Sequence, residues 1–131
     1  MATRIDIVKD FLAGLSKGHD GMMDAIQRYF TPDTIYENVG MMTTRGADEA
    51  IDLMQQMEDN MGVDLLDISV LAIATHGNTV LSERLDRMLK LDGSEVGHFR
   101  VMGAFEVEDD KILAWRDYFD TAGTIAMMQK A

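Results

Sequence analysis

Residues 79–120 read TVLSERLDRMLKLDGSEVGHFRVMGAFEVEDDKILAWRDYFD, and the pattern of this segment indicates the fold most clearly. It belongs to a series of four apolar segments that are separated only by turn-sized breaks. The segments are 63–75, 79–91, 95–108 and 111–120, and the breaks are HisGlyAsn at 76–78, AspGlySer at 92–94 and GluAspAsp at 108–110. Breaks this short join antiparallel neighbours. The pattern therefore predicts a meander of four antiparallel strands.

The first half of the chain has helical periodicity instead. Apolar residues recur at helical spacing in three segments, which are 5–15 after Thr3 as N-cap, 22–30 and 46–60. Pro32 is expected to close the second helix, because the residue before a proline avoids the helical region. Residues 34–39 predict a short strand, and 121–130 predict a terminal helix around Ile125 and Met128. Helices followed by an antiparallel sheet indicate an α+β fold in which the helices cover one sheet face.

Length, charge and composition exclude several classes of function. The chain has 131 residues, a formal net charge of −11 and no Cys. We expect a single domain over residues 1–131, without a thiol nucleophile, thiolate metal site or iron–sulfur cluster. Such an acidic surface repels phosphate backbones and anionic lipid, which argues against nucleic-acid and membrane binding. No segment approaches 18 apolar residues and no signal segment is recognisable, so we expect a cytoplasmic protein.

Polar side chains fall on apolar faces of two predicted strands, because side chains alternate between the faces of a strand. The face of 111–120 that holds Asp117 also carries Leu113, Trp115 and Phe119. The face of 79–91 that holds Arg84 and Asp86 also carries Ser82 and Met88, and the opposite face carries Leu81, Leu85 and Leu89. A carboxylate in apolar surroundings needs a partner, since desolvation penalises its charge. If the two faces meet, one guanidinium lies between two carboxyl groups.

Two carboxyl groups around one guanidinium can keep different protonation states, one serving as general acid and the other as general base. Tyr36 and Asn38 share a face of the short strand and could together fix a water molecule. Structural alternatives exist for each group. Arg84 with Asp86 also fits an exposed cross-strand ion pair, Asp117 also fits a helix cap, and the Tyr and Asn also fit ordinary buried hydrogen bonding.

Motifs for other kinds of chemistry are missing from the sequence. His19, His76 and His98 are scattered without metal-binding spacing, and there is no nucleotide-binding loop or serine-hydrolase motif, so we expect no metal and no cofactor. Among the twelve Met residues, Met54 and Met57 have the spacing of a helix core. Their thioethers equally suit a pocket that adapts to irregular apolar ligands.

Three separated motifs together resemble the limonene-1,2-epoxide hydrolase family, within the nuclear-transport-factor-2-like folds. They are TyrGluAsn at 36–38, GluArgLeuAsp at 83–86 and TrpArgAspTyrPheAsp at 115–120. The resemblance is strongest over 79–120. It implies a cone-shaped fold, in which a curved mixed or antiparallel sheet carries helices on its concave face around an apolar pocket.

The resemblance also implies a cofactor-independent epoxide hydrolase and a role for each polar residue. Asp117 would take a proton from a water molecule held by Tyr36 and Asn38, and that water would attack an epoxide carbon. Asp86 would give a proton to the epoxide oxygen, and Arg84 would bridge the two acids. The expected reactants are a small apolar epoxide and water, and the product is a vicinal diol formed without a covalent intermediate. The side chains expected to contact the substrate are Met88, Phe99, Val101, Trp115 and Phe119.

Two other functions fit the same fold. An isomerase or cyclase acting on a steroid or polyketide would use Asp117 alone to shuttle a proton. A non-catalytic dimeric module that binds apolar ligands would use neither acid. On every interpretation we expect a homodimer that forms through the convex side of the sheet. The reason is that this second sheet face carries a row of Leu side chains at 81, 85 and 89.

Overall fold

A computed structural model describes residues 2–130; Met1 and Ala131, which the predicted domain includes, lie outside the described residues. The described chain forms four helices and six strands. The helices are α1 (Arg4–Leu15), α2 (Gly18–Tyr29), α3 (Gly46–Met61) and α4 (Thr121–Lys130). The strands are β1 (Phe30–Asn38), β2 (Met42–Arg45), β3 (Leu65–His76), β4 (Thr79–Leu89), β5 (Glu95–Glu108) and β6 (Lys111–Tyr118).

The strands form one mixed sheet in the order β2-β1-β6-β5-β4-β3. The four strands from β3 to β6 pair antiparallel with their sequence neighbours, which confirms the predicted meander. β1 joins this meander by pairing parallel with β6. That pairing makes the sheet mixed and brings residues from the first third of the chain beside the last strand.

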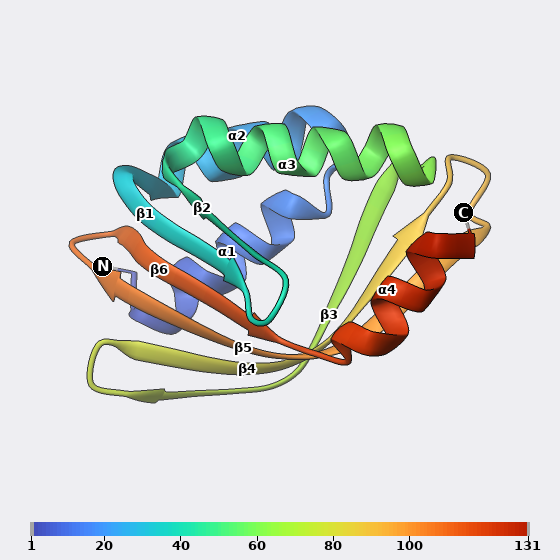
Figure 1. Cartoon of the computed structure of the whole chain (residues 1–131). Coiled ribbons are helices and arrows are strands. Elements are labelled where there is room, and N and C mark those ends of the chain that lie inside the picture. Colours follow the sequence, from blue (N-terminus) through green and yellow to red (C-terminus); the bar gives the residue numbers. More distant parts are fainter. Residues whose placement is uncertain (1, 131) are drawn as a thin grey trace.

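Helices α1, α2 and α3 lie on the same side of the curved sheet (Figure 1), so the predicted α+β fold is confirmed. Helix α1 begins as predicted, because Thr3 accepts a hydrogen bond from the backbone of Asp6 and Asp6 in turn accepts one from the backbone of Thr3. Its buried side chains, such as Phe11, pack into the hollow of the sheet against aromatic residues including Phe105 and Trp115. None of the helices within residues 2–130 is both long and apolar enough to cross a bilayer.

The second helix ends earlier than predicted. α2 stops at Tyr29, and Pro32 lies inside β1 rather than closing the helix. The ladder between β1 and β6 is irregular between Phe30 and Ile35, so the missing N–H of Pro32 falls where no regular pairing is made. The hydroxyl of Thr34 donates to the carbonyl of Ile112 at 2.6 Å and ties this irregular segment to β6.

The prediction that Leu113 shares a face with Trp115 and Asp117 is wrong. Leu113 is 40% exposed, whereas Trp115 and Asp117 are buried. The pairing of β5 with β6 shifts between Glu106 and Val107, which leaves one extra residue in β6 at this point. A β-bulge of this kind resets the alternation of side chains, and period-two counting cannot cross it.

The C-terminal helix forms as predicted, but its contacts differ from the prediction. Ile125 is 44% exposed, and among the described side chains of α4 it is Thr124 that is buried. The side chain of Met128, also expected to centre this helix, lies outside what the structure describes. Strand β2 was not predicted; its four residues, MetThrThrArg, pair antiparallel with the end of β1 and lead directly into α3.

Candidate active site

Arg84 of β4 is fully buried beneath the concave face of the sheet, and each of its five N–H groups has an acceptor. Nε donates to Oδ1 of Asp86 at 3.2 Å, and Nη2 donates to Oδ2 of Asp86 at 2.9 Å. Nη2 also donates to Oδ2 of Asp117 at 2.9 Å, and Nη1 donates to Oδ1 of the same carboxyl group at 3.1 Å. The remaining N–H of Nη1 reaches Oγ of Ser82 at 3.2 Å. The structure thus brings the predicted guanidinium and both predicted carboxyl groups into one bonded cluster.

Strand alternation and pairing explain why these side chains meet. Arg84 and Asp86 lie two residues apart on β4 and so point to the same face. Asp117 comes from β6, with β5 in between, and Gly103 of β5 is the residue paired with Asp117 on one side and with Ser82 on the other. A Cβ atom at position 103 would lie 2.8 Å from Oδ1 of Asp117. The missing side chain of Gly103 therefore provides the space through which the guanidinium reaches across to β6.

Burial and charge act against each other within this cluster. Burial raises the pKa of Asp117 above its ordinary value, and the adjacent Arg84 opposes this effect only in part. Burial also works to lower the pKa of Arg84, but the charges of Asp117 and Asp86 outweigh it and the pKa is raised. The guanidinium therefore stays charged. The raised pKa makes Asp117 a better proton acceptor than an exposed carboxylate.

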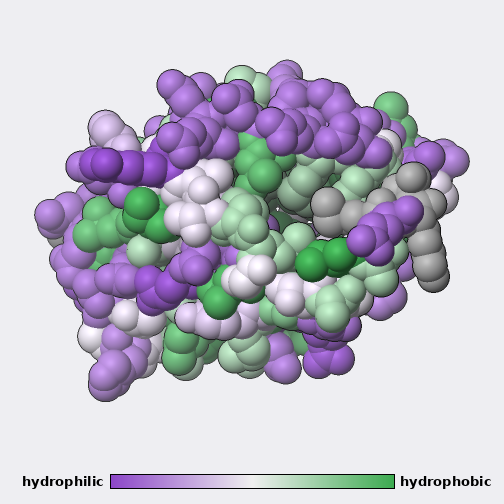
Figure 2. Space-filling view, viewed as in Figure 1, coloured by the Kyte–Doolittle hydropathy of each residue, from purple (hydrophilic) through white to green (hydrophobic). Residues whose placement is uncertain are grey.

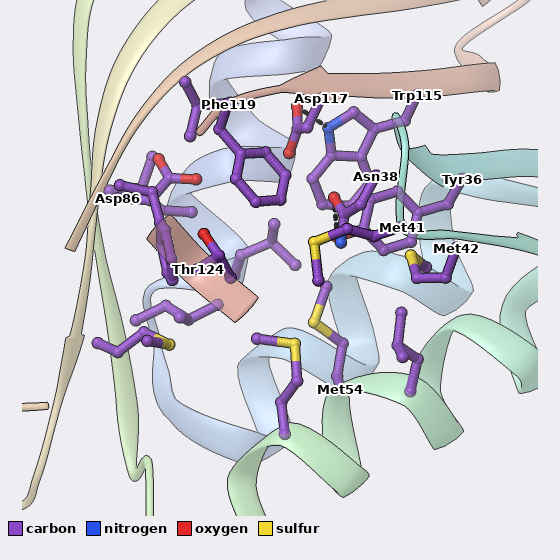
Figure 3. Close-up of a pocket in the computed structure, with 18 of the residues that line it drawn as sticks. Tyr36, Asn38, Met41, Met42, Met54, Asp86, Trp115, Asp117, Phe119 and Thr124 are labelled. Carbon is purple, nitrogen blue, oxygen red and sulfur yellow. Dashed lines mark hydrogen bonds between the residues drawn. The ribbon is translucent and has the colours of Figure 1, made fainter. Parts of the chain in front are cut away.

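Tyr36 and Asn38 lie near Trp115 and Asp117, as Figure 3 shows. The parallel pairing of β1 with β6 sets Tyr36 opposite Trp115 and Asn38 opposite Asp117. The phenol of Tyr36 donates to Oδ1 of Asn38 at 3.2 Å, and its ring stacks on Trp115 with a centroid distance of 4.0 Å. Burial, followed by the charge of Asp117, raises the pKa of Tyr36, so the phenol keeps its proton. Both polar groups are thus neutral hydrogen-bonding partners next to a basic carboxylate.

Tyr36, Asn38, Asp86 and Asp117, together with Thr124, are the polar lining of a cavity of about 180 Å³ whose other lining side chains are apolar. The five side chains expected to contact a substrate all line it: Met88, Phe99, Val101, Trp115 and Phe119. Figure 2 shows a hollow in the surface between α3, β2 and α4, with hydrophobic residues around it. The cavity is smaller than the roughly 300–1,000 Å³ typical of sites for drug-sized ligands. Its shape and lining suit a small, neutral, apolar molecule.

Methionine supplies much of the apolar lining. The methionines that line the cavity are Met41, Met42, Met54, Met57, Met61 and Met88. Met54 also belongs to the buried core cluster, so it is both a core residue and part of the cavity lining. Unbranched thioether side chains change rotamer easily and can adapt to the outline of a ligand.

Some contacts and residues of the site were not predicted from the sequence. Trp115 donates its indole N–H to Oδ1 of Asp117 at 2.8 Å, in addition to lining the cavity. Ser82 was placed on the correct face, and its spacing of two from Arg84 could have indicated the bond between them. Gly103 and Thr124 gave no local signal, because their positions depend on strand pairing and on the packing of α4. Across residues 2–130, no three His, Cys, Asp or Glu side chains are grouped so as to hold a metal ion.

Comparison with known proteins gives one family and one fold. The family model described as the limonene-1,2-epoxide hydrolase catalytic domain matches residues 2–130. Epoxide hydrolase EphG of Mycobacterium tuberculosis is 35% identical over 97 residues, which is 74% of this chain. The match covers 62% of the length of that relative.

Solved structures agree with this result. The structure of a limonene-epoxide-hydrolase-like epoxide hydrolase from M. tuberculosis superposes with a TM-score of 0.76 at 30% identity, covering 97% of this chain and 90% of that one. A SnoaL-like polyketide cyclase, described as putative, from Shewanella putrefaciens has a TM-score of 0.78 at 11% identity, covering 100% and 88% of the two chains. The second likeness concerns the fold alone. Structures described as NTF2-like proteins also match this chain, so the predicted nuclear-transport-factor-2-like fold is confirmed.

Proposed function

The chain belongs to the limonene-1,2-epoxide hydrolase family, and we propose that it adds water to an apolar epoxide and releases a vicinal diol. The observation that carries the proposal is the bonding of one buried guanidinium to two carboxyl groups that line a mostly apolar cavity. An epoxide is neutral and strained, so its opening asks only for a proton acceptor at the water and a proton donor at the oxygen.

Asp117 is the general base in this proposal. It lies beside Asn38 in the parallel ladder, and Tyr36 bonds to the same amide, so a water molecule next to Asp117 has hydrogen-bonding partners on two sides. Asp117 takes one proton from this water. The freed electron pair forms the new bond to an epoxide carbon while the bond from that carbon to the epoxide oxygen breaks.

Asp86 is the general acid and protonates the departing oxygen. Its side chain is 17% exposed and lines the cavity, so it can reach a bound epoxide, whereas Arg84 is fully enclosed and cannot. The net charge of the cluster favours one proton shared by the two carboxyl groups. With both carboxyl groups ionised, the guanidinium and the two carboxylates carry a net charge of −1, and burial disfavours an uncompensated charge. With one carboxyl group protonated, the cluster is neutral.

Diol formation from limonene-1,2-epoxide and cyclohexene oxide tests the proposal directly. We expect wild type to form diol and Asp117→Asn to lose about 10²-fold or more of kcat/KM. Asp67→Asn is the matched control, because Asp67 pairs with Arg87 at 3.2 Å in an exposed ion pair of the same sheet and should keep its rate. Wild type that forms no more diol than Asp117→Asn on a broad epoxide panel contradicts the proposal.

A single turnover in ¹⁸O-labelled water separates one-step attack from a covalent route. Direct attack by water puts the label in the diol and none in the protein. Label found in Asp117 would mean that this carboxylate had attacked the epoxide and formed an ester. Arg84→Ala tests the isomerase or cyclase alternative, since a reaction that uses Asp117 alone keeps much of its rate without the bridge between the two acids.

We also propose that two copies pair through the convex sheet face. Leu81, Met102 and Tyr118 on β4, β5 and β6 are between 45% and 49% exposed, which leaves large apolar side chains in water on that face. A second copy would cover them by self-complementary packing. Light scattering should give a dimer for wild type and a monomer for Leu81→Lys, and a wild-type monomer at micromolar concentration contradicts this pairing.

A further inference from the structure

The two oxygens of Asp117 have different hydrogen-bonding environments. Oδ1 accepts from Nε1 of Trp115 at 2.8 Å and from Nη1 of Arg84 at 3.1 Å. Oδ2 accepts from Nη2 of Arg84 at 2.9 Å. Each carboxylate oxygen offers about two acceptor positions. Oδ1 is therefore fully used, and Oδ2 keeps one acceptor position for another donor.

The orientation of the carboxyl group agrees with this count. In Figure 3 the dashed bond joins one oxygen of Asp117 to the indole of Trp115, and the other oxygen points toward the cavity.

The side chain of Trp115 is itself fixed by its ring contacts. Its ring stacks between Tyr36 and Phe105, with interplanar angles of 20° and 17°, and meets Phe11 edge to face. The indole N–H has no room to turn to another acceptor.

We propose that Trp115 is a positioning residue which reserves Oδ2 of Asp117 as the atom that receives the proton of the attacking water. The inference rests on the proposed epoxide hydrolase function and assigns the base to one atom. In this step the O–H bond of water breaks and its proton goes to Oδ2. The electron pair of that bond forms the new bond to carbon, and the epoxide oxygen leaves with the proton of Asp86.

This role has a consequence for the pH dependence of the reaction. The indole donates to the charged form of Asp117 and so lowers its pKa, opposing burial in the same sense as Arg84. Among the described residues, the other titratable groups that act on Asp117 are Asp86 on β4 and Tyr36 on β1. Removing the indole N–H while keeping these groups raises the pKa of Asp117 further. The base then stays protonated, and inactive, up to a higher pH.

The sequence allows the donor to be removed without changing the ring. Trp115 is the single Trp of the chain, so growth of a Trp auxotroph on β-(3-benzothienyl)alanine replaces this one residue by a ring of similar shape without an N–H. We expect the acid limb of kcat/KM for cyclohexene oxide to move up by about one pH unit, which corresponds to about 1.4 kcal/mol. At pH values above the limb, the rate should return to within about threefold of wild type.

Trp115→Phe should shift the limb in the same direction, with an added loss at all pH values from poorer packing. An acid limb that stays in place in the benzothienyl protein, or a loss of equal size at every pH, overturns the inference. Wild type without activity on any epoxide would instead count against the proposed function, so the two failures can be told apart.

A second measurement does not depend on turnover. The ¹H–¹⁵N spectrum of the protein contains one indole signal, because there is one Trp. We expect this signal to titrate with the same pKa as the acid limb in wild type and to lose that titration in Asp117→Asn. An indole signal that does not move through the acid limb overturns the inference.

Discussion

Replacing Gly103 by Ala is expected to disrupt the charge cluster without straining the backbone. The added Cβ would lie 2.8 Å from Oδ1 of Asp117 and 3.1 Å from Oγ of Ser82, and closer still to Nη1 of Arg84. The φ angle of Gly103 is not in the left-handed region, so Ala fits the backbone and the penalty is purely steric. Because β5 is a central strand of the sheet, the side-chain cluster has to move instead.

The cost follows from the hydrogen bonds that must break. To clear the new methyl group, Nη1 has to leave its two acceptors, Ser82 at 3.2 Å and Asp117 at 3.1 Å. A hydrogen bond to a charged group contributes roughly 1.5–3 kcal/mol, so two broken bonds lower the free energy of unfolding by about 3 kcal/mol or more. A displacement of roughly 1 Å in a catalytic group costs about 10²-fold in rate, which sets the expected loss of diol formation.

Gly97→Ala is the matched control on the same strand. Its Cβ would approach Sδ of Met127 at 2.6 Å, and the end of a flexible thioether side chain can move away. We expect a change of less than about 1 kcal/mol in urea unfolding and an unchanged rate of diol formation from cyclohexene oxide. If Gly103→Ala proves as stable and as active as Gly97→Ala, then the guanidinium does not need the space that Gly103 leaves.

Three further predictions concern charge and burial. Arg84→Lys should cost about 10²-fold or more in kcat/KM, because a single ammonium group cannot hold two carboxyl groups as a planar fork does; wild-type kinetics would contradict this. Because the pKa of Asp117 is raised in the folded protein, its protonated form contributes stability that is fully present below the ordinary pKa of an Asp and is lost as pH rises through the raised pKa. The difference in unfolding free energy between wild type and Asp117→Asn should therefore decrease with rising pH between these two pKa values. Tyr29 donates its hydroxyl to Asp10, and neither residue lines the cavity, so Tyr29→Phe should lower the free energy of unfolding by about 1 kcal/mol and leave the diol rate unchanged.

The parts of the fold that depend on local pattern could be predicted from the sequence. The turn-sized breaks after β3, β4 and β5 gave the meander, and helical spacing gave all four helices to within a few residues. Alternation along β4 correctly placed Arg84 and Asp86 on the concave side and Leu81 on the convex side. These features depend on neighbours that are close in sequence, and a single chain is enough to see them.

The features that were missed depend on contacts between distant segments. Nothing near Leu113 marks the bulge, because it arises where β5 and β6 pair out of register. The parallel pairing of β1 with β6 likewise has no local signal, although it sets Asn38 beside Asp117. Placing Tyr36 and Asn38 next to Asp117 required the family resemblance rather than the periodicity of the strand.

On the proposed mechanism, the pairing of two acids around one guanidinium keeps the charge of the cluster constant during the reaction. One proton enters at Asp117 as another leaves from Asp86, so the cluster is neutral both before and after the epoxide opens. A single carboxylate acting alone would have to create or lose a charge in an apolar cavity, where an uncompensated charge is costly. Nη2 of Arg84 bonds to both acids at 2.9 Å and therefore has a carboxylate partner in either protonation state. Because a guanidinium in proteins does not release its protons, the return of the proton from Asp117 to Asp86 has to use water that enters the cavity after the diol leaves.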